Sequence, residues 1–594
     1  MSRKNYLKLI LIFPFLLVAL FFILHLGGLF SGGSFAGNGN RQFEDYTSDL
    51  FRQEVSNNAI TLHYTLKVPS DYGISKTPLS LGQVSTDTVA MGAAAENALS
   101  RLKRYDYDAL SEDNKLIYQL LEDTFSSAVA MAPYALYEEP LSPLTGTQAQ
   151  LPVLLSEYQF YSASDVTVYL DLLKELPEYF QAIADFEQAK ADAGLFMSYE
   201  HAMAVMDECD AFVAMGRDHY LYATFEKRVA ELVEDAGWRE WIDKNDACMR
   251  QYVFPAYELL KRELWEICQE VYGEVRDDRI ADGSGNGLYH FPEGKDYYRL
   301  LVREMTGSDR SIVELKGMTL AQIVRDLEDL ESAVEDYSEE TPSEDDLDAI
   351  FVDSNPMSLL HTLKGKLDGI FPEPPDVDIS VKFVDASMED YMSPAFYLIP
   401  AIDNSTDNVI YINPAHMTDE LTLFTTLAHE GYPGHLYQTT YFASQKPHPV
   451  RSLLGCGGYT EGWATYCEMV SYYFAPVPKA CATLMQKNSS VMLGLYALAD
   501  MGIHYDGWTL QDTVDFFAEY GITDAEAIAE IYNLIVGDPA NYLKYYIGYL
   551  EFLELKRDAM KCWGDDFSQE RFHREVLEAG PIPFWMLREE LGVE

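Results

Sequence analysis

Two histidines and a glutamate lie close together in residues 429–435, which read His-Glu-Gly-Tyr-Pro-Gly-His. Zinc hydrolases commonly place two histidines four residues apart on one helix, with a glutamate general base beside the first. Here His435 follows His429 after six residues. On an unbroken helix, that spacing rotates the second side chain by about 120° and moves it about 9 Å along the axis. The two imidazoles could then not share one metal ion.

Pro433 and Gly434 lie between the two histidines. Proline removes a backbone donor and clashes with the preceding turn, and glycine adopts backbone angles that are closed to other residues. We therefore expect the helix that carries the first histidine to end near Gly431. His435 would then return toward that histidine from a loop or from the start of a new helix.

A catalytic zinc ion needs three protein ligands and an open coordination position. His429 and His435 supply two ligands, and the third is expected on a following helix. Residues 459–468 have helical spacing and contain Glu461 and Glu468, which are seven residues apart and so lie on about the same helix face. One of these glutamates can bind the metal, and the other can hold an imidazole N–H.

Hydrolysis also needs a general base and a donor for the oxyanion. Glu430 is adjacent to the first histidine and is placed to take a proton from the attacking water. Residues 538–549 hold four tyrosines within eight positions, which are candidate oxyanion donors. His504, four residues after Asp500, is a second candidate. For each of these residues the alternative is an ordinary buried aromatic or histidine.

Composition limits the classes of partner. The 594 residues include 43 basic and 95 acidic side chains, which give a net charge of −52. This charge argues against a nucleic-acid partner, whose phosphates it would repel. It predicts a solubilising surface, with steering of cationic peptides or metal ions as the functional alternative. Seven scattered cysteines without a C-x-x-C pair argue against a disulfide framework or a cysteine zinc site.

The N-terminus has the pattern of a targeting segment. Arg3, Lys4 and Lys8 precede a largely apolar run over residues 9–30, long enough to span a bilayer. Because positive charge before such a run favours a cytoplasmic N-terminus, we expect residues 1–30 to be an uncleaved anchor in the cell membrane and the body to be extracellular. A cleaved signal peptide is the alternative.

Hydrophobic spacing predicts a mainly α-helical chain with a minor sheet. Residues 165–193, 199–213 and 218–236 have apolar side chains three and four positions apart. Residues 377–384, 395–400 and 408–413 are typical of strands, and the last two should form a hairpin. We divide the chain into the anchor, a linker (31–44), an N-terminal helical region (45–360) and a catalytic region (361–594).

Several ordered motifs resemble a bacterial family long labelled a domain of unknown function, with the signature H-E-x-x-P-G-H. They are residues 429–435, Glu461-Gly-Trp-Ala-x-Tyr-x-Glu468, Asp500-x-Gly-x-His504 and Tyr545-x-Ile-Gly548. The resemblance covers about residue 394 to the C-terminus. That family is regarded as zinc peptidases of the gluzincin type. In plan it is similar to angiotensin-converting enzyme, thimet oligopeptidase and Taq carboxypeptidase.

The resemblance implies a two-lobed helical shell around a deep channel, with a small hairpin beside the active-site helix. It implies one zinc ion per chain on His429, His435 and Glu461, with Tyr545 and His504 as transition-state donors. The implied activity is hydrolysis of short extracellular peptides, of the carboxypeptidase or dipeptidyl-carboxypeptidase type. Two alternatives stay open: a non-catalytic peptide-binding surface protein with a structural metal, and a zinc amidase acting on cell-wall fragments. The oligomeric state is not indicated.

Overall fold

The computed structural model describes residues 39–76, 78–143, 145–232, 238–273, 285–335, 351, 353–384, 389, 393–417 and 419–593. Within them the chain is mainly helical with one small sheet, as predicted. The predicted anchor, residues 1–30, lies outside this part of the chain, and no described helix is long and apolar enough to cross a membrane. The first described helix begins at Asn40, so the end of the predicted linker is helical.

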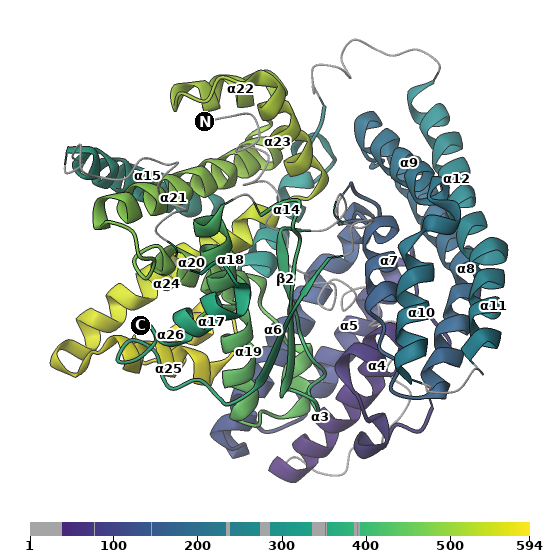
Figure 1. Cartoon of the computed structure of the whole chain (residues 1–594), viewed down its shortest axis with the longest axis horizontal. Coiled ribbons are helices and arrows are strands. Elements are labelled where there is room, and N and C mark those ends of the chain that lie inside the picture. Colours follow the sequence, from purple (N-terminus) through teal and green to yellow (C-terminus); the bar gives the residue numbers. More distant parts are fainter. Residues whose placement is uncertain are drawn as a thin grey trace.

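Thirteen labelled α-helices precede the sheet among the described residues (Figure 1). Their bounds are α3 (Asn40–Val55), α4 (Ala59–Thr65), α5 (Thr88–Leu102), α6 (Glu112–Met131), α7 (Thr147–Glu157), α8 (Ala163–Asp192), α9 (Tyr199–Ala214), α10 (Tyr220–Leu232), α11 (Trp238–Cys248), α12 (Phe254–Tyr272), α14 (Gly294–Thr306), α15 (Ile312–Glu335) and α17 (Pro356–Lys364).

The described chain after the sheet is helical again. Its bounds are α18 (Glu420–Glu430), α19 (His435–Ser444), α20 (Gly457–Ser471), α21 (Lys479–Met501), α22 (Leu510–Glu519), α23 (Ala525–Gly537), α24 (Asn541–Trp563), α25 (Gln569–Ala579) and α26 (Phe584–Glu590). A single wider helical turn, Gly502–Asp506, directly continues α21.

Helix α8 shows how local sequence specifies these elements. Ser162 and Asp165 form a capping box that satisfies backbone donors at its first turn. Apolar side chains then recur three and four residues apart along its buried face, among them Val166, Leu170 and Leu173. The predicted helices over residues 165–193, 199–213 and 218–236 correspond to α8, α9 and α10.

The sheet has the strand order β1-β3-β2. β2 (Ala395–Leu398) and β3 (Asp407–Ile412) form the predicted antiparallel hairpin, and β1 (Asp378–Phe383) pairs with β3 in parallel. Successive side chains of a strand point to opposite faces. Accordingly, Ile410 and Ile412 enter one hydrophobic core, whereas Tyr411 enters another.

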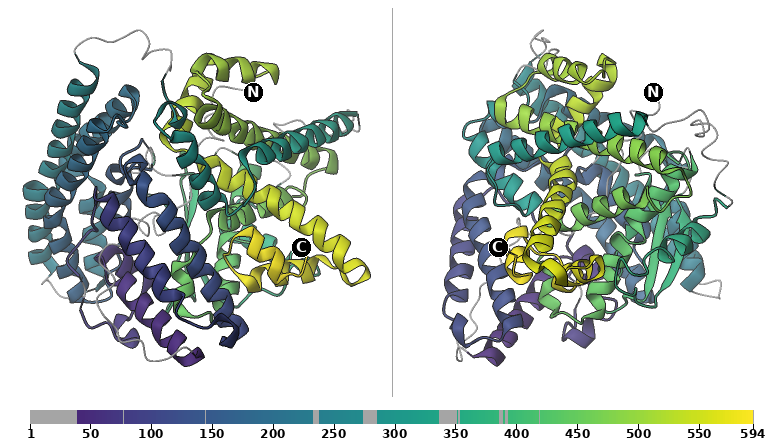
Figure 2. Two further views of the ribbon diagram at one scale, coloured as in Figure 1. Left: turned by 180° about the vertical axis from the view of Figure 1, so that it is seen from behind. Right: turned by 90° about the vertical axis from the view of Figure 1, so that its left-hand side faces the viewer.

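Two large cores therefore meet at the sheet. One contains buried side chains of α7 to α12 together with Val384, Phe396 and Tyr411. The other joins the N-terminal helices α3, α5 and α6 to the helices that follow the sheet. Figures 1 and 2 show the α8–α12 group on the side of the molecule opposite α15, α21 and α24. All seven cysteines are free, in agreement with the predicted lack of a disulfide framework.

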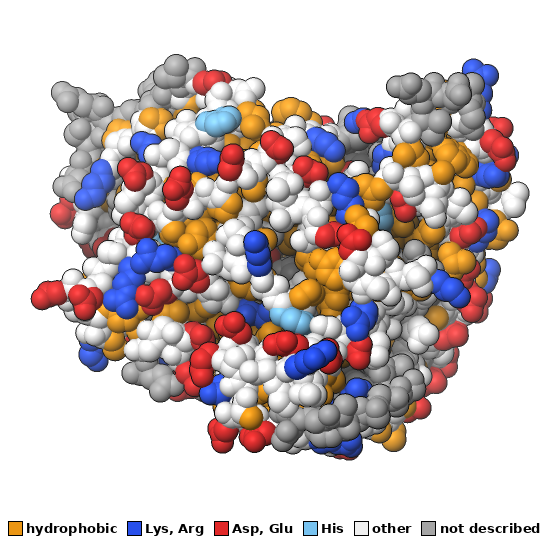
Figure 3. All heavy atoms as spheres, turned by 90° about the horizontal axis from the view of Figure 1, so that it is seen from below, with side chains coloured by type: hydrophobic (Ala, Val, Ile, Leu, Met, Phe, Trp, Pro, Cys, Tyr) orange, Lys and Arg blue, Asp and Glu red, His pale blue; other side chains and the backbone are white. Residues whose placement is uncertain are grey.

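Seen from below, the surface mixes acidic and basic side chains, and a hollow lies near the centre of this face (Figure 3). Acidic residues outnumber basic ones in the whole chain by 95 to 43. An excess of one charge repels further anions and keeps a protein soluble. The observed surface is consistent with the predicted solubilising role of the acidic residues.

Burial raises the pKa of several carboxyl groups in the folded chain. The pKa values of Glu54, Glu187 and Asp500 each rise to about 8, because burial disfavours the charged form. In the unfolded chain such groups lose their protons near a pKa of about 4. The stability that folding gains by retaining these protons is fully present below about pH 4, and it is lost as the pH rises to about 8.

Several buried histidines act in the opposite direction. Burial lowers the pKa of His219 and His573 to about 3 and that of His504 to about 4. Unfolded imidazoles take up protons below about pH 6.5. The stability that depends on neutral imidazoles is therefore present above about pH 6.5 and is lost as the pH falls toward 3.

We expect the thermal unfolding midpoint to change little from pH 5 to 6.5, where the two sets oppose each other, and to fall from pH 6.5 to 8.5. Deprotonation of Glu54, Glu187 and Asp500 should lower the free energy of unfolding by about 2–6 kcal/mol over this range, since one pKa unit corresponds to about 1.4 kcal/mol per group. Calorimetry at constant ionic strength measures it. Glu187→Gln should reduce this loss, whereas Glu112→Gln on the exposed face of α6 should not. A midpoint that rises toward pH 8.5 would contradict the assignment.

Candidate metal centre

The predicted break between the two motif histidines is present. Asp419 starts α18 by accepting a hydrogen bond from the Thr422 N–H at 2.7 Å. Helix α18 ends at Glu430, and α19 begins at His435. The backbone angles at the interruption are not helical: Gly434, directly before α19, has φ −80° and ψ −133°. The two histidines therefore belong to different helices.

Gly434 permits a tight return of the chain. A Cβ atom at this position would lie 1.8 Å from the His429 carbonyl oxygen and 2.5 Å from that of Ala428. The Gly434 N–H donates to the Ala428 carbonyl at 2.9 Å. Since any side chain would collide with this backbone, the motif needs glycine here. The close approach brings the start of α19 back against the end of α18.

Helix α20 holds the loop between the two helices in place. The Pro433 carbonyl accepts hydrogen bonds from Trp463 Nε1 at 2.9 Å and from Cys467 Sγ at 3.3 Å. Trp463 is fully buried. Our sequence reasoning did not assign this role to Trp463, although it lies two residues after Glu461 on the helix already expected to supply a ligand. Loop and ligand helix are thus fixed to each other.

Three buried side chains converge where α18, α19 and α20 meet. Glu461 Oε2 lies 3.8 Å from His429 Nε2 and 3.4 Å from His435 Nε2. The exposed fractions of His429, His435 and Glu461 are 2%, 5% and 0%. Ligands held tetrahedrally at zinc distances of about 2.0–2.1 Å are about 3.3 Å apart. The separations at Glu461 are close to that value.

None of the converging atoms has a hydrogen-bond partner among the described residues. This holds for Nε2 of both histidines and for both carboxylate oxygens of Glu461. Buried polar atoms are almost always satisfied, and leaving one unpaired costs about 1–3 kcal/mol. Imidazole nitrogens and a carboxylate are donors that zinc accepts. The residues present therefore fit a divalent metal of the zinc type.

Glu430 has a different role from Glu461 in this geometry. Donor atoms of His429, Glu430 and His435 lie within 4.8 Å of one another, so proximity alone also permits Glu430 as a ligand. However, Glu430 Oε2 accepts the Tyr397 backbone N–H of β2 at 2.9 Å. Both Glu461 oxygens are unpartnered. If a metal ion binds here, this geometry favours Glu461 as the third ligand and leaves Glu430 beside it, where burial raises the pKa of its carboxyl group.

Glu468 orients the first histidine. The Nδ1–H of His429 donates to Glu468 Oε2 at 3.0 Å, which leaves Nε2 facing His435 and Glu461. A carboxylate behind a ligand imidazole fixes its tautomer and raises its basicity. The sequence placed the two glutamates on one helix face and left their roles open. The structure assigns the imidazole contact to Glu468.

The cluster as it stands holds protons between its acids and bases. Burial pulls the pKa of His429 down, but Glu461 and Glu468 outweigh it and raise that pKa to about 10. Burial alone would raise the pKa of Glu461, but His435 and His429 hold it at about 2. A metal ion that enters must therefore displace a proton from His429.

Tyr545 lies beside the cluster. Its ring stacks on that of His429, with centroids 6.4 Å apart and an interplanar angle of 29°. Its hydroxyl is buried and has no partner among the described residues. Burial, followed by the charges of Glu461 and Glu430, raises its pKa well above the ordinary value, so the hydroxyl stays protonated. It can donate a hydrogen bond to an oxygen atom of a bound substrate.

Glycines allow α24 to approach α20 closely, and this approach places Tyr545 of α24 beside His429. A Cβ at Gly462 would lie 2.3 Å from the Gly548 carbonyl carbon. A Cβ at Gly548 would lie 2.1 Å from the Gly458 carbonyl oxygen. Both contacts involve backbone, which cannot move aside as a flexible side chain can. The crossing therefore admits only glycine at these positions.

We expect Gly548→Ala to lower the free energy of unfolding by about 1–3 kcal/mol, the usual cost of overpacking. The separation of α20 and α24 should also move Tyr545 away from His429. Chemical denaturation measures the first effect. Gly317→Ala is the matched control, because no atom lies within 4 Å of a Cβ in that part of α15. There alanine should stabilise by about 0.5–1 kcal/mol. Equal effects of the two substitutions would refute the packing argument.

His504 is not brought to the cluster. Its Nδ1 accepts the Leu288 N–H at 3.1 Å, and its Nε2 donates to the Ile535 carbonyl at 2.9 Å. Both ring nitrogens are thus used by the backbone. Asp500 does not pair with it either, because Asp500 accepts the Tyr298 hydroxyl and the Ala540 N–H. These contacts match the alternative of an ordinary buried histidine, and the transition-state role of His504 stays a prediction.

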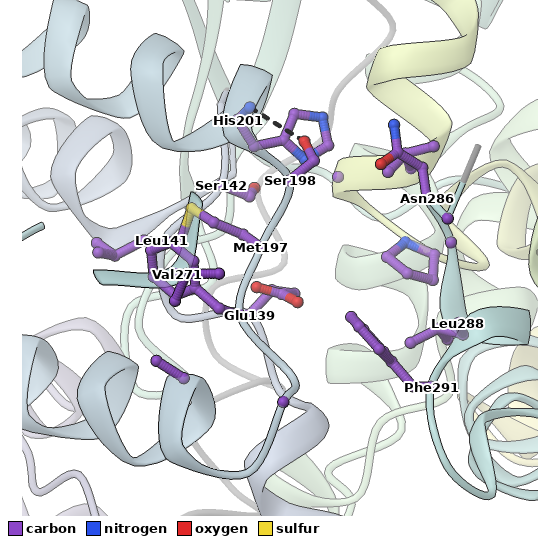
Figure 4. A pocket seen from close by; sticks show the side chains of 18 of the residues that line it. Glu139, Leu141, Ser142, Met197, Ser198, His201, Val271, Asn286, Leu288 and Phe291 are labelled. Carbon is purple, nitrogen blue, oxygen red and sulfur yellow. Dashed lines mark hydrogen bonds between the residues drawn. The ribbon is translucent and has the colours of Figure 1, made fainter. Parts of the chain in front are cut away.

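A pocket lies between α9 and the end of α23 (Figure 4). Leu141, Met197 and Val271 face Leu288 and Phe291 across it. Its lining also includes residues of the segment that leads into α24: Val536, Gly537 and Pro539. The lining mixes apolar side chains with polar ones, among them Glu139, His201 and Asn286.

Comparison with known proteins places the chain in a family. A crystal structure of a "putative lipoprotein" from Colwellia psychrerythraea has 18% identity and a TM-score of 0.75, over 93% of this chain and 98% of that one. A similarly described protein of unknown function from Shewanella oneidensis has 17% identity and a TM-score of 0.63, over 94% and 99%. At these identities the likeness shows the fold alone. Among curated proteins, none matches. The model of the family "Bacterial protein of unknown function (DUF885)" matches residues 73–591, so the chain belongs to this family.

Proposed function

We propose that the protein is a zinc-dependent peptidase with one ion held by His429, His435 and Glu461. The observation that carries this proposal is the convergence of buried, unpartnered imidazole and carboxylate atoms at 3.4 and 3.8 Å. The resemblance of the ordered motifs to gluzincin-type peptidases supports the same ligand set. A structural zinc site usually has four protein ligands, and here three side chains converge.

A zinc ion bound there would supply a Lewis acid that polarises a carbonyl group and makes water acidic near neutral pH. Glu430, held by the Tyr397 N–H, is the residue that accepts a proton from the attacking water and passes it to the leaving amine. Glu468 keeps the His429 ring oriented. The Tyr545 hydroxyl donates to the oxygen that gains charge as the peptide bond breaks.

The proposed substrates are short extracellular peptides, cleaved in a carboxypeptidase or dipeptidyl-carboxypeptidase manner. Burial of every candidate ligand supports limited access, because a folded protein could not reach them. We further propose that residues 1–30 anchor the protein in the cell membrane with its body outside. Two structural neighbours described as lipoproteins are consistent with a surface location.

The experiment that tests this proposal combines metal content with product analysis. The purified soluble body, from residue 39, is measured for bound metal and then incubated with a mixed peptide library. We expect about one zinc per chain and fragments shortened from the C-terminus. Peptides that bind without cleavage would favour the peptide-binding alternative. Cleavage of cell-wall amides alone would favour the amidase. A protein without stoichiometric metal would refute the proposal.

Tyr545→Phe is expected to lower kcat by about 10²- to 10³-fold, the usual cost of losing one oxyanion donor. The KM and the zinc content should change little, because the hydroxyl acts only as charge develops. Tyr546→Phe is the matched control, since that hydroxyl lies toward Gly494 of α21 and away from the cluster. Steady-state kinetics measure both. A kcat that Tyr545→Phe leaves unchanged would exclude the donor role.

A further inference from the structure

Lys544 is a buried cation with no assigned role. It precedes Tyr545 on α24 and is 8% exposed. Its side-chain stem runs beside Gly457 at the start of α20, where a Cβ would lie 3.8 Å from both Cβ and Cδ of Lys544. The ammonium lies 5.4 Å from the centre of the Tyr545 ring. Within the described part of the chain, it has no hydrogen-bond or ion-pair partner.

An ammonium with three donors is costly to bury without an acceptor. The other buried lysine, Lys190, illustrates the usual solution. It donates to the Glu138 carbonyl and forms an ion pair with Glu139 at 2.5 Å. Lys544 has no equivalent acceptor from the described residues. An oxygen anion from outside the chain would satisfy it.

Lys544 lies beside Tyr545 and acts electrostatically on Asp538. Tyr545, whose ring lies near the ammonium, stacks on His429. Burial raises the pKa of Asp538 to about 6, and the charge of Lys544 opposes that rise. Asp538 adjoins Pro539, which lines the pocket. The ammonium is therefore close to the residue that stacks on His429 and to the segment that enters the pocket lining.

The surroundings of Lys544 are otherwise acidic. Glu430, Glu461, Glu468 and Asp538 all belong to this part of the molecule, and the whole chain carries a net charge of −52. These acids would repel a carboxylate on a substrate. A single unpaired cation can reverse that preference locally, because an ammonium–carboxylate contact strengthens when it is removed from water.

We propose that Lys544 forms a carboxylate-binding subsite, which receives the C-terminal carboxylate of the peptide substrate. The inference rests on the proposed peptidase function, because it places the substrate beside the same cluster. It makes Lys544 a specificity-determining residue: a peptide with a free C-terminus is bound, and one with a blocked C-terminus is not. An acidic side chain has the same chemistry and is the alternative source of the anion.

Binding to the Glu430→Gln protein tests the subsite without turnover. Calorimetry compares one zinc-loaded protein with three ligands: a tripeptide with a free C-terminus, its C-terminal amide, and an amidated tripeptide ending in glutamate. We expect the free acid to bind about 10- to 100-fold more tightly than the amide. Lys544→Met in the same background should remove that difference, and Lys544→Arg should retain part of it. Lys561→Met, on the exposed end of α24, should leave it unchanged.

Equal affinities for the free acid and the amide would overturn the inference, as would a preference that persists in Lys544→Met. If the amidated glutamyl peptide binds tightly and Lys544→Met abolishes that binding, Lys544 recognises an acidic side chain and not the C-terminal carboxylate. Unfolding midpoints of the variants show whether each remains folded, and Lys544→Arg preserves the test if the methionine variant does not. Failure of the unmutated protein to cleave any peptide would refute the peptidase function, while the affinities still report on Lys544.

Discussion

Replacing Glu430 with glutamine is expected to lower kcat for peptide hydrolysis by about 10²- to 10⁴-fold, the usual contribution of a general base. Glutamine keeps the size of the side chain and can still accept the Tyr397 N–H through its carbonyl oxygen. It cannot accept a proton from water. The metal content should stay at one ion per chain, because the ligand set His429, His435 and Glu461 is intact. Metal analysis and steady-state kinetics on the same preparation separate the two properties.

A second glutamate on the same helix provides the control. Glu420 lies in the first turn of α18, ten residues before Glu430, so Glu420→Gln alters the charge of the helix and leaves the site unchanged. It should retain kcat within about twofold, as surface substitutions usually have small effects. If Glu430→Gln hydrolyses peptides at the unmutated rate, Glu430 is not the base. If it loses zinc as well, Glu430 belongs to the ligand set after all.

The sequence contains enough information to predict the break in the motif helix. Pro433 and Gly434 each oppose a continuous helix for local reasons, namely a missing backbone donor and a glycine without Cβ. The hairpin was equally accessible, because alternation of side chains along residues 395–400 and 408–413 is a local pattern. Local rules of this kind operate without knowledge of the rest of the chain.

Tertiary contacts are the part that local rules miss. Glu461 and Glu468 share a helix face by their spacing, so only the approach of α18 decides which of them faces Nε2 and which faces Nδ1 of His429. The backbone donor for Glu430 comes from Tyr397, 33 residues earlier on a separate strand. Neither relation has a periodicity that could be recognised in the sequence.

The lack of a contact between Asp500 and His504 has a specific cause. Its four-residue distance from Asp500 suggested a side-chain pair on a regular helix. However, α21 ends at Met501, and Gly502–Asp506 form a wider helical turn, in which the i, i+4 relation no longer holds. Each side chain then finds its own backbone partners: Ala540 N–H for Asp500, and Leu288 N–H with the Ile535 carbonyl for His504. Such a turn is not evident from residue types.

Replacing each of the two glutamates of α20 with glutamine in turn is expected to separate their roles. Glu461→Gln should weaken zinc binding by about 10³-fold, since a zinc binding free energy of about 10–16 kcal/mol is shared among its ligands. Glu468→Gln should weaken it by only about 10- to 100-fold, the usual effect of removing a group behind a ligand. The two residues lie seven positions apart on one helix, so both variants test the same charge change. Competition with a chelator of known affinity measures each constant.

The ratio of the two losses of zinc affinity distinguishes the metal ligand from the residue that orients His429. Neither oxygen of Glu461 has a hydrogen-bond partner among the described residues, and Oε2 contacts the two histidines of the cluster, so glutamine would preserve no separate structural role. Glu468 holds the Nδ1–H of His429, and the glutamine carbonyl can still accept that hydrogen bond with less charge behind it. A larger loss for Glu468→Gln than for Glu461→Gln would reverse the assignment. Equal losses would mean that both carboxylates contact the ion, which would then have no open position for a substrate oxygen.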